Sequence, residues 1–228
     1  FDPNKYSEAS DPGLYENPLV ENVYELGSIM KPITIASGLD SGKLKAGTTY
    51  EDTGSVTIDG KKISNYDGKG RGHATMQDVL NQSLNVGAAY AESLMGADVY
   101  RNYLKRFGFY EKTGIDLPNE RTNLMENLDS GHQVDFATAA FGQGIALEPL
   151  SMVRALAALG NGGHIIKPHI TKTIDYTLGV AEKTKTIEQG RAISKESSDE
   201  ITRMLVKVVD EHLAHGAIKM EHYSIAAK

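Results

Sequence analysis

A continuous apolar stripe at helical spacing runs through residues 194–213 and constrains the fold more than any other feature of the sequence. Its members repeat every three or four residues, so they share one helix face that must be buried: they are Ile201, Met204, Leu205, Val208, Val209 and Leu213. Further helices are predicted at residues 28–40, 75–80, 86–95, 98–107 and 149–159. Strand patterns are confined to a hairpin around Asp59-Gly60 and to residues 165–174 and 223–227. The sequence therefore predicts a helix-rich chain with few strands.

The composition excludes several classes of function. The 228 residues carry a net charge of −6 and form no basic stripe, which argues against a nucleic-acid partner. The chain has no cysteine, so disulfides, thiolate catalysis and cysteine zinc sites are excluded. No apolar run approaches the roughly 20 residues of a membrane helix. Because the sequence starts at Phe1 rather than Met and stops in an apolar segment at Lys228, we expect residues 1–228 to be part of one domain, truncated at both ends.

A serine and a lysine stand three residues apart at the predicted start of the first helix, in Gly27-Ser28-Ile29-Met30-Lys31. Residues three apart lie side by side on a helix, which brings the Lys31 amine to the Ser28 hydroxyl. A lysine whose pKa is lowered by burial or by nearby positive charge can take the proton of that hydroxyl. Free backbone N–H groups at a helix start can hold an oxyanion. The alternative is that Ser28 only caps the helix while Lys31 is solvated, and for this tetrad considered alone that is the commoner case.

Two further polar elements could serve the same chemistry. Ser83-Leu84-Asn85 lies in a polar break between two predicted helices, where a hydroxyl could relay a proton and an amide could hold a carbonyl or an amine. The alternative is that these residues only interrupt one helix and cap the next. Lys228 ends an apolar strand pattern, and a cation there could hold a substrate carboxylate, although a lysine at such a position is usually just solvated.

In this order, the three elements match the motif set of penicillin-binding proteins and class A β-lactamases. The chain resembles the transpeptidase domains of class B penicillin-binding proteins along nearly its whole length. The resemblance is carried by residues 1–4, 24–32, 75–87, 107–118 and 141–150, with Leu26 where the family usually has proline. Lys112-Thr113-Gly114 spells the third motif of the family. We expect this string to be the decoy that the family commonly carries before an Ile-Asp-Leu-Pro segment, and Lys228 to begin the active-site copy.

The resemblance implies a fold and a reaction. The implied fold is α/β and β-lactamase/transpeptidase-like, here a helix-rich fragment that lacks most of the central antiparallel sheet. The implied reaction is peptidoglycan D,D-transpeptidation through a serine acyl-enzyme. Ser28 is then the nucleophile, Lys31 the base and Ser83 the proton relay. Asn85 and Lys228 are implied to bind the substrate.

The resemblance also implies partners and a location. We expect peptidoglycan stem peptides as substrates, β-lactam antibiotics as ligands, and a glycosyltransferase as a cell-wall synthesis partner. The implied location is the extracytoplasmic face of the bacterial membrane, with an anchor outside these residues. We expect residues 1–228 by themselves to be only marginally stable and inactive, because a lone sheet strand cannot satisfy its own backbone.

Three alternatives remain open from the residues. A serine β-lactamase of the same fold would need a base for a deacylating water, and the Glu-x-x-Leu-Asn string of class A enzymes does not occur here. A β-lactam sensor would keep the same serine and lysine. A metal site could use His212, His215 and His222, but no His-Glu-x-x-His string is present. We expect no metal and no cofactor.

Overall fold

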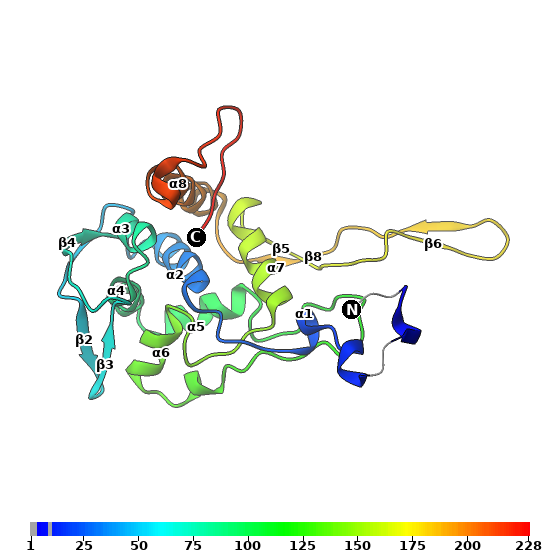
Figure 1. Ribbon diagram of the computed structural model, residues 1–228, viewed down its shortest axis with the longest axis horizontal. Coiled ribbons are helices and arrows are strands. Elements are labelled where there is room, and N and C mark those ends of the chain that lie inside the picture. Colours follow the sequence, from blue (N-terminus) through cyan, green and yellow to red (C-terminus); the bar gives the residue numbers. More distant parts are fainter. Residues whose placement is uncertain (1–3, 9–10) are drawn as a thin grey trace.

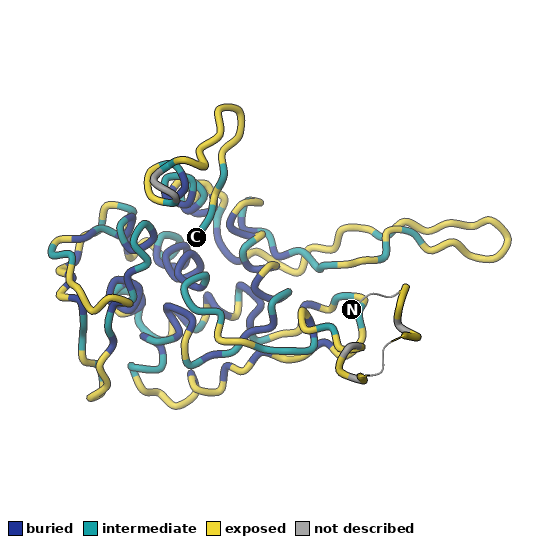
Figure 2. The backbone as a smooth tube through the Cα atoms, viewed as in Figure 1, coloured by how far each residue is buried: buried dark blue, intermediate teal, exposed yellow. Residues whose placement is uncertain are grey.

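The computed structural model describes residues 4–8 and 11–228, so Phe1-Asp2-Pro3, on which part of the resemblance rests, lies outside the described residues. At its centre is helix α2 (Lys31–Asp40), which packs against α4 (Asn85–Met95), α7 (Pro149–Gly160) and α8 (Lys195–Glu211) (Figure 1). Every residue of α2 from Lys31 to Gly38 is buried. A helix buried on all sides belongs to the core of a domain, and Figure 2 shows it as dark blue within the body.

The predicted helices are confirmed with shifts of a few residues at their ends. Pro32 lies in the first turn of α2, where its missing N–H leaves no carbonyl unsatisfied, and Ser41 ends the helix. Helix α3 (Met76–Asn81) begins at a capping box between Thr75 and Asp78. The apolar stripe lies on α8 and is buried, apart from Leu213, which lies just past the end of the helix.

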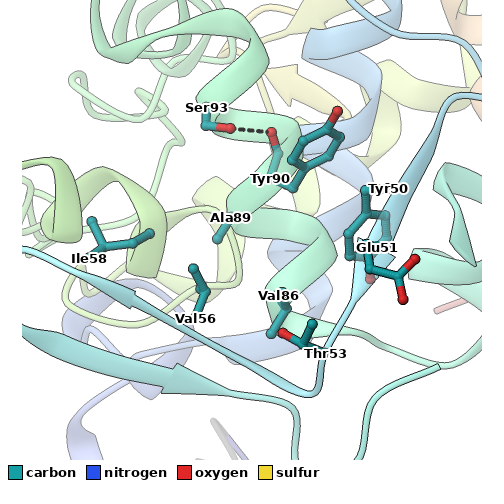
Figure 3. A pocket seen from close by; sticks show the side chains of 9 residues that line it. All are labelled: Tyr50, Glu51, Thr53, Val56, Ile58, Val86, Ala89, Tyr90 and Ser93. Atoms are coloured by element: carbon teal, nitrogen blue, oxygen red, sulfur yellow. Dashed lines mark hydrogen bonds between the residues drawn. The ribbon is translucent and has the colours of Figure 1, made fainter. Parts of the chain in front are cut away.

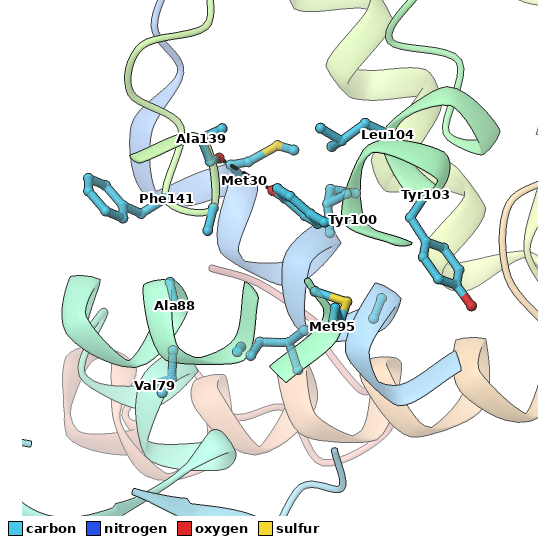
Figure 4. Packing of buried hydrophobic residues seen from close by; sticks show 14 of the residues in the cluster. Met30, Val79, Ala88, Met95, Tyr100, Tyr103, Leu104, Ala139 and Phe141 are labelled. Carbon is cyan, nitrogen blue, oxygen red and sulfur yellow. Dashed lines mark hydrogen bonds between the residues drawn. The ribbon is translucent and has the colours of Figure 1, made fainter. Parts of the chain in front are cut away.

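Shorter helices complete the chain. They are α1 (Pro18–Glu21), α5 (Ala97–Arg106), α6 (Gln133–Ala139) and the 3-10 turns η1 (Tyr6–Glu8), η2 (Pro12–Tyr15), η3 (Gly27–Met30), η4 (Glu126–Asp129) and η5 (Leu213–Gly216). Figure 4 shows how Met30, Tyr100, Leu104 and Ala139 gather between α2, α5 and the end of α6. This cluster joins the start of α2 to the rest of the core. Among the described helices, none combines the length and the apolarity that crossing a bilayer requires.

The strands form four separate antiparallel pairs in the described residues. The pairs are β1 (Thr49–Asp52) with β4 (Gly72–Thr75), β2 (Ser55–Ile58) with β3 (Lys61–Ser64), β5 (His164–Ile166) with β8 (Glu188–Arg191), and β6 (Thr173–Asp175) with β7 (Ala181–Lys183). The predicted hairpin is confirmed, and both Asp59 and Gly60 have positive φ, as its two-residue turn requires. The helix-rich mixed α/β class with little sheet is confirmed as well. The β6–β7 hairpin extends from the body as an exposed arm (Figure 2).

Two strand predictions need correction. Residues 165–174 are not one strand, because β5 ends at Ile166 and β6 begins at Thr173 with a different partner. The strand predicted at residues 223–227 is wrong, because this segment has no regular structure. Its Ala227 N–H donates to the Leu205 carbonyl of α8 at 3.4 Å, so the end of this segment meets a helix instead of a neighbouring strand. A strand needs a neighbouring strand for its ladder, and periodicity cannot supply one.

Candidate active site

Ser28 lies in the 3-10 turn η3, which runs directly into α2. The turn is held by the loop after α6: Gly27 donates its N–H to the Gly142 carbonyl at 3.1 Å. A Cβ on Gly142 would come within 2.2 Å of the Gly27 carbonyl oxygen, and Gly142 has φ +80°. Only glycine fits such a close approach at positive φ. The Phe141–Ile145 segment therefore fixes the turn that carries Ser28, a role that the sequence did not indicate.

The Lys31 amine is the centre of the site. Its Nζ lies 3.0 Å from Ser28 Oγ, 2.7 Å from the Ser83 carbonyl oxygen, 3.0 Å from Ser83 Oγ and 2.8 Å from Asn85 Oδ1. The side chain is 0% exposed. The serine–lysine spacing predicted the contact with Ser28, whereas only the fold brings in residues 83 and 85. The alternative in which Lys31 is solvated is therefore wrong.

Ser83 and Asn85 are aimed by the turn between α3 and α4. Ser83 has φ +56°, and its Oγ donates to Ser28 Oγ at 2.9 Å. Asn85 is the first residue of α4, and its Nδ2 donates to the Ser64 carbonyl at 2.9 Å. Because the nitrogen of this amide is used on that side, Oδ1 is left to face Lys31. Ser83 and Asn85 thus both contact Lys31, and Ser83 also contacts Ser28.

Burial, followed by the positive charge of Lys228, lowers the pKa of Lys31 from 10.5 to about 7. Burial also lowers the pKa of Lys228 itself. The structure therefore brings Lys228 close enough to act on Lys31, although it makes no direct contact of the kind that joins the other four residues. An amine with a pKa near 7 is substantially neutral at neutral pH, so it can accept a proton from a hydroxyl.

These contacts define what the arrangement can do. The Ser28 hydroxyl has two neighbours able to take or pass on its proton, Lys31 Nζ and Ser83 Oγ, and these two also contact each other. Such a triangle can take a proton from the serine and later return it to a leaving group. The positive charge of Lys228 favours an anionic substrate group nearby.

The backbone of Lys112-Thr113-Gly114 is hydrogen-bonded to residues outside the candidate active site. Thr113 is buried, and the N–H groups of Thr113 and Gly114 both donate to the carboxylate of Glu120. The Thr113 carbonyl accepts from Gln189 Nε2 at 3.1 Å. With these N–H groups already occupied, this turn is not available to bind an oxyanion.

The histidines considered as metal ligands do not assemble in the described part of the chain. His212 ends α8 and His222 is exposed, while the side chain of His215 lies outside the described residues. Among the described residues, no group of three or more histidine, aspartate or glutamate side chains is placed to hold a metal ion.

A mostly apolar pocket of about 390 Å³ lies between β1, β2 and α4 (Figure 3). The rings of Tyr50 and Tyr90 stack on its wall with their centroids 5.3 Å apart. Val86, the residue after Asn85, contributes to its lining. The pocket therefore adjoins the same helix start that carries Asn85.

The chain is similar along its whole length to known proteins. A family model described as the penicillin binding protein transpeptidase domain matches residues 1–228. The chain is 36% identical to stage V sporulation protein D of Bacillus subtilis, covering 100% of this chain and 36% of that protein. It is 27% identical to a peptidoglycan D,D-transpeptidase FtsI homolog of Mesostigma viride, covering 75% of this chain and 30% of that protein. The chain thus spans about a third of the length of these curated relatives.

Solved structures agree on the fold. The D,D-transpeptidase domain of a peptidoglycan glycosyltransferase from Eggerthella lenta superposes with a TM-score of 0.85 at 22% identity, over 99% of this chain and 58% of that one. A peptidoglycan synthetase from Bifidobacterium adolescentis also gives 0.85, at 25% identity, over 96% of this chain and 40% of that one. The β-lactamase/transpeptidase-like fold class predicted from the sequence is confirmed.

Proposed function

The chain belongs to the penicillin-binding protein transpeptidase domain family, and on that premise we propose that it is a penicillin-binding peptidoglycan D,D-transpeptidase acting through a serine acyl-enzyme at Ser28. The observation that carries the proposal is the position of the Lys31 amine, within 3.0 Å of both Ser28 Oγ and Ser83 Oγ and 2.8 Å from Asn85 Oδ1. A buried amine with these neighbours and a pKa of about 7 suits a base more than a structural cation.

Acylation forms the bond between Ser28 Oγ and the substrate carbonyl carbon and breaks the C–N bond to the terminal D-alanine. Ser28 Oγ attacks the carbonyl carbon between the two terminal D-alanines of a stem peptide, and its proton passes to Lys31. The tetrahedral oxyanion is stabilised in part by backbone N–H groups of the turn around Ser28, which lie before the first full helical bonds. The C–N bond then breaks, and D-alanine leaves with the proton that Lys31 returns through Ser83. The product is an ester on Ser28.

Deacylation runs the same proton path in reverse. The amine of a neighbouring stem peptide gives up a proton through Ser83 and Lys31 and attacks the ester carbonyl. The C–O bond to Ser28 breaks, Oγ regains its proton, and a new amide cross-links the two peptides. Asn85 holds Lys31 and the substrate amide, and Lys228 attracts the terminal carboxylate of the donor. A β-lactam presents a similar amide and carboxylate, so it acylates the same serine.

The cell-wall setting follows from the substrate. We propose stem peptides and β-lactams as ligands, a glycosyltransferase as a partner in wall synthesis, and action at the extracytoplasmic face of the membrane. Residues 1–228 by themselves are proposed to be inactive. The support is that the described strands form four separate pairs rather than one sheet, and that residues 1–228 span 36% of their Bacillus relative.

A fluorescent penicillin tests the acyl-enzyme. In the natural protein that contains these residues, we expect one label per chain, located on the Ser28 peptide by mass spectrometry. Ser28→Ala should abolish labelling. Ser93→Ala is the matched control, since Ser93 is an exposed helical serine whose hydroxyl bonds only the nearby Tyr90 carbonyl. Labelling of Ser28→Ala at the wild-type level would refute the proposal.

Two further measurements separate the alternatives. Prompt hydrolysis of nitrocefin would identify a β-lactamase, whereas we expect a stable adduct. Labelling without cross-linking of stem peptides would identify a sensor. Stoichiometric labelling of residues 1–228 by themselves would contradict their proposed inactivity without affecting the assignment of Ser28.

A further inference from the structure

A buried pair of polar side chains lies beside the active site without touching Ser28 or Lys31. Asp52, at the end of β1, is 1% exposed, and Asn65, just after β3, is 3% exposed. Asn65 Nδ2 donates to both carboxylate oxygens of Asp52, at 3.0 and 2.9 Å. Asp52 also accepts from the N–H groups of Gly54 and Arg71, at 3.1 and 3.2 Å. The carboxylate is therefore fully partnered, which burial requires.

The other end of the Asn65 amide reaches helix α4. Asn65 Oδ1 accepts from the Val86 N–H at 3.2 Å, and Val86 is the second residue of that helix. The first N–H groups of a helix have no acceptor within it, and a polar side chain at the N-cap usually supplies one. The N-cap here is Leu84, whose side chain cannot accept a hydrogen bond. Asn65, which follows β3, thus provides the cap that α4 lacks.

The Val86 N–H that Asn65 caps belongs to the residue after Asn85, and the Asn85 amide contacts the Lys31 amine. Asn85 precedes Val86, and its Nδ2 donates to the carbonyl of Ser64, the residue before Asn65. Two consecutive residues at the end of β3 therefore hold the side chain of Asn85 and the backbone of Val86. On the other side, a Cβ at Gly87 would come within 2.5 Å of Tyr50 Oη, so α4 starts in close contact with β1, in the region shown in Figure 3.

The orientation of the Asn65 amide is determined by its partners. Its nitrogen donates to Asp52 and also to the Lys69 carbonyl at 3.1 Å, and its oxygen accepts from Val86. A flipped amide would set two acceptors against its oxygen and a donor against its nitrogen. Asp52 and the Lys69 carbonyl therefore fix the orientation of the Asn65 amide, whose oxygen caps the start of α4.

We propose that Asn65, oriented by Asp52, is a positioning residue for the reaction: it fixes the start of α4 so that the Asn85 amide stays in contact with the Lys31 amine. The inference rests on the proposed function, because acylation of Ser28 is its readout. A shift of about 1 Å in such a contact can slow catalysis by about a hundredfold. We expect loss of the Asn65 side chain to lower the maximal acylation rate by about 10- to 100-fold.

The chain contains a matched control. Asn123 is likewise buried, at 7% exposure. Its Nδ2 donates to the Phe109 carbonyl at 2.9 Å and to Ser151 Oγ at 3.0 Å, and its Oδ1 accepts from the Glu148 N–H at 2.7 Å. Glu148 is the N-cap of α7, so Asn123 makes the same kind of bond to a helix start that carries none of the proposed catalytic groups. Its loss should cost similar stability without slowing acylation.

The experiment measures acylation of the natural protein by a fluorescent penicillin as a function of penicillin concentration and pH. Concentration dependence separates the maximal rate from non-covalent binding, and pH dependence gives the midpoint set by Lys31. For Asn65→Ala we expect a lower maximal rate and a displaced midpoint compared with Asn123→Ala at equal folded fraction.

Each outcome has one meaning. If wild-type protein is not acylated, the proposed function fails before this inference is reached. If wild type is acylated, an Asn65 variant whose maximal rate or midpoint matches that of its Asn123 counterpart overturns the positioning role. If Asn65→Ala does not fold, Asn65→Ser is compared with Asn123→Ser in the same way.

Discussion

Replacing Lys228 with methionine should shift the pH dependence of acylation upward. The pKa of Lys31 is lowered from 10.5 to about 7, first by burial and second by the charge of Lys228. At pH 7 about half of the amine is then neutral, against about 1 in 3,000 at the ordinary value, because each pKa unit is a factor of ten. Methionine removes the charge but keeps an apolar chain of similar length, so burial is retained. The midpoint should therefore rise, by less than half of the gap between about 7 and 10.5, because burial is the larger cause.

The direction of the profile follows from the role of the base. Lys31 accepts a proton only when neutral, so the rate should climb as pH rises through about 7 and level off above it. The assay is the maximal acylation rate with a fluorescent penicillin over a pH series. Lys195→Met is the control, since Lys195 is an exposed lysine paired with Asp199, and its midpoint should equal that of wild type. A wild-type midpoint near 10, or a Lys228→Met midpoint that is unchanged or lower, would refute this reasoning.

Three other substitutions probe the site and its support. Ser83→Ala removes the hydroxyl that bonds Ser28 Oγ at 2.9 Å, so acylation should slow about 100-fold or more while the melting temperature changes little. Burial raises the pKa of Glu92 from 4.5 to about 7, so wild-type stability should fall as pH rises from about 5 to 8, and Glu92→Gln should flatten that dependence by up to about 3 kcal/mol in denaturant unfolding. Gly142→Ala should cost about 1–3 kcal/mol and slow acylation, because its Cβ would clash with Gly27, whereas Gly179→Ala has a similar φ of +76° in open space and should not affect the site.

Much of the local structure could be predicted because its causes are local. Helix α8 follows from an apolar stripe, the β2–β3 hairpin from Asp59-Gly60, and the start of α3 from the capping box of Thr75 and Asp78. Each of these signals lies within a few residues of its effect. The strand predictions failed where the structure depends on residues that are distant in the sequence. Strands β1 and β4 pair residues 20 or more positions apart, and the segment at 223–227 has the pattern of a strand but contacts α8 through Ala227. A ladder depends on a partner that no local pattern reveals.

By itself, the sequence determined which residues are the candidates for chemistry, because helical geometry sets a serine beside a lysine three positions later, and the family likeness pointed to the others. Only the tertiary structure decided the pKa of that lysine. Ser83 and Asn85, which contact Lys31, are more than 50 residues away from it in the sequence. Gly142, which holds the turn of Ser28, is more than 100 residues away from that turn, and Lys228 lies at the far end of the chain. An amine becomes a base near neutral pH through the water excluded and the charges gathered around it, and both are properties of the packed fold.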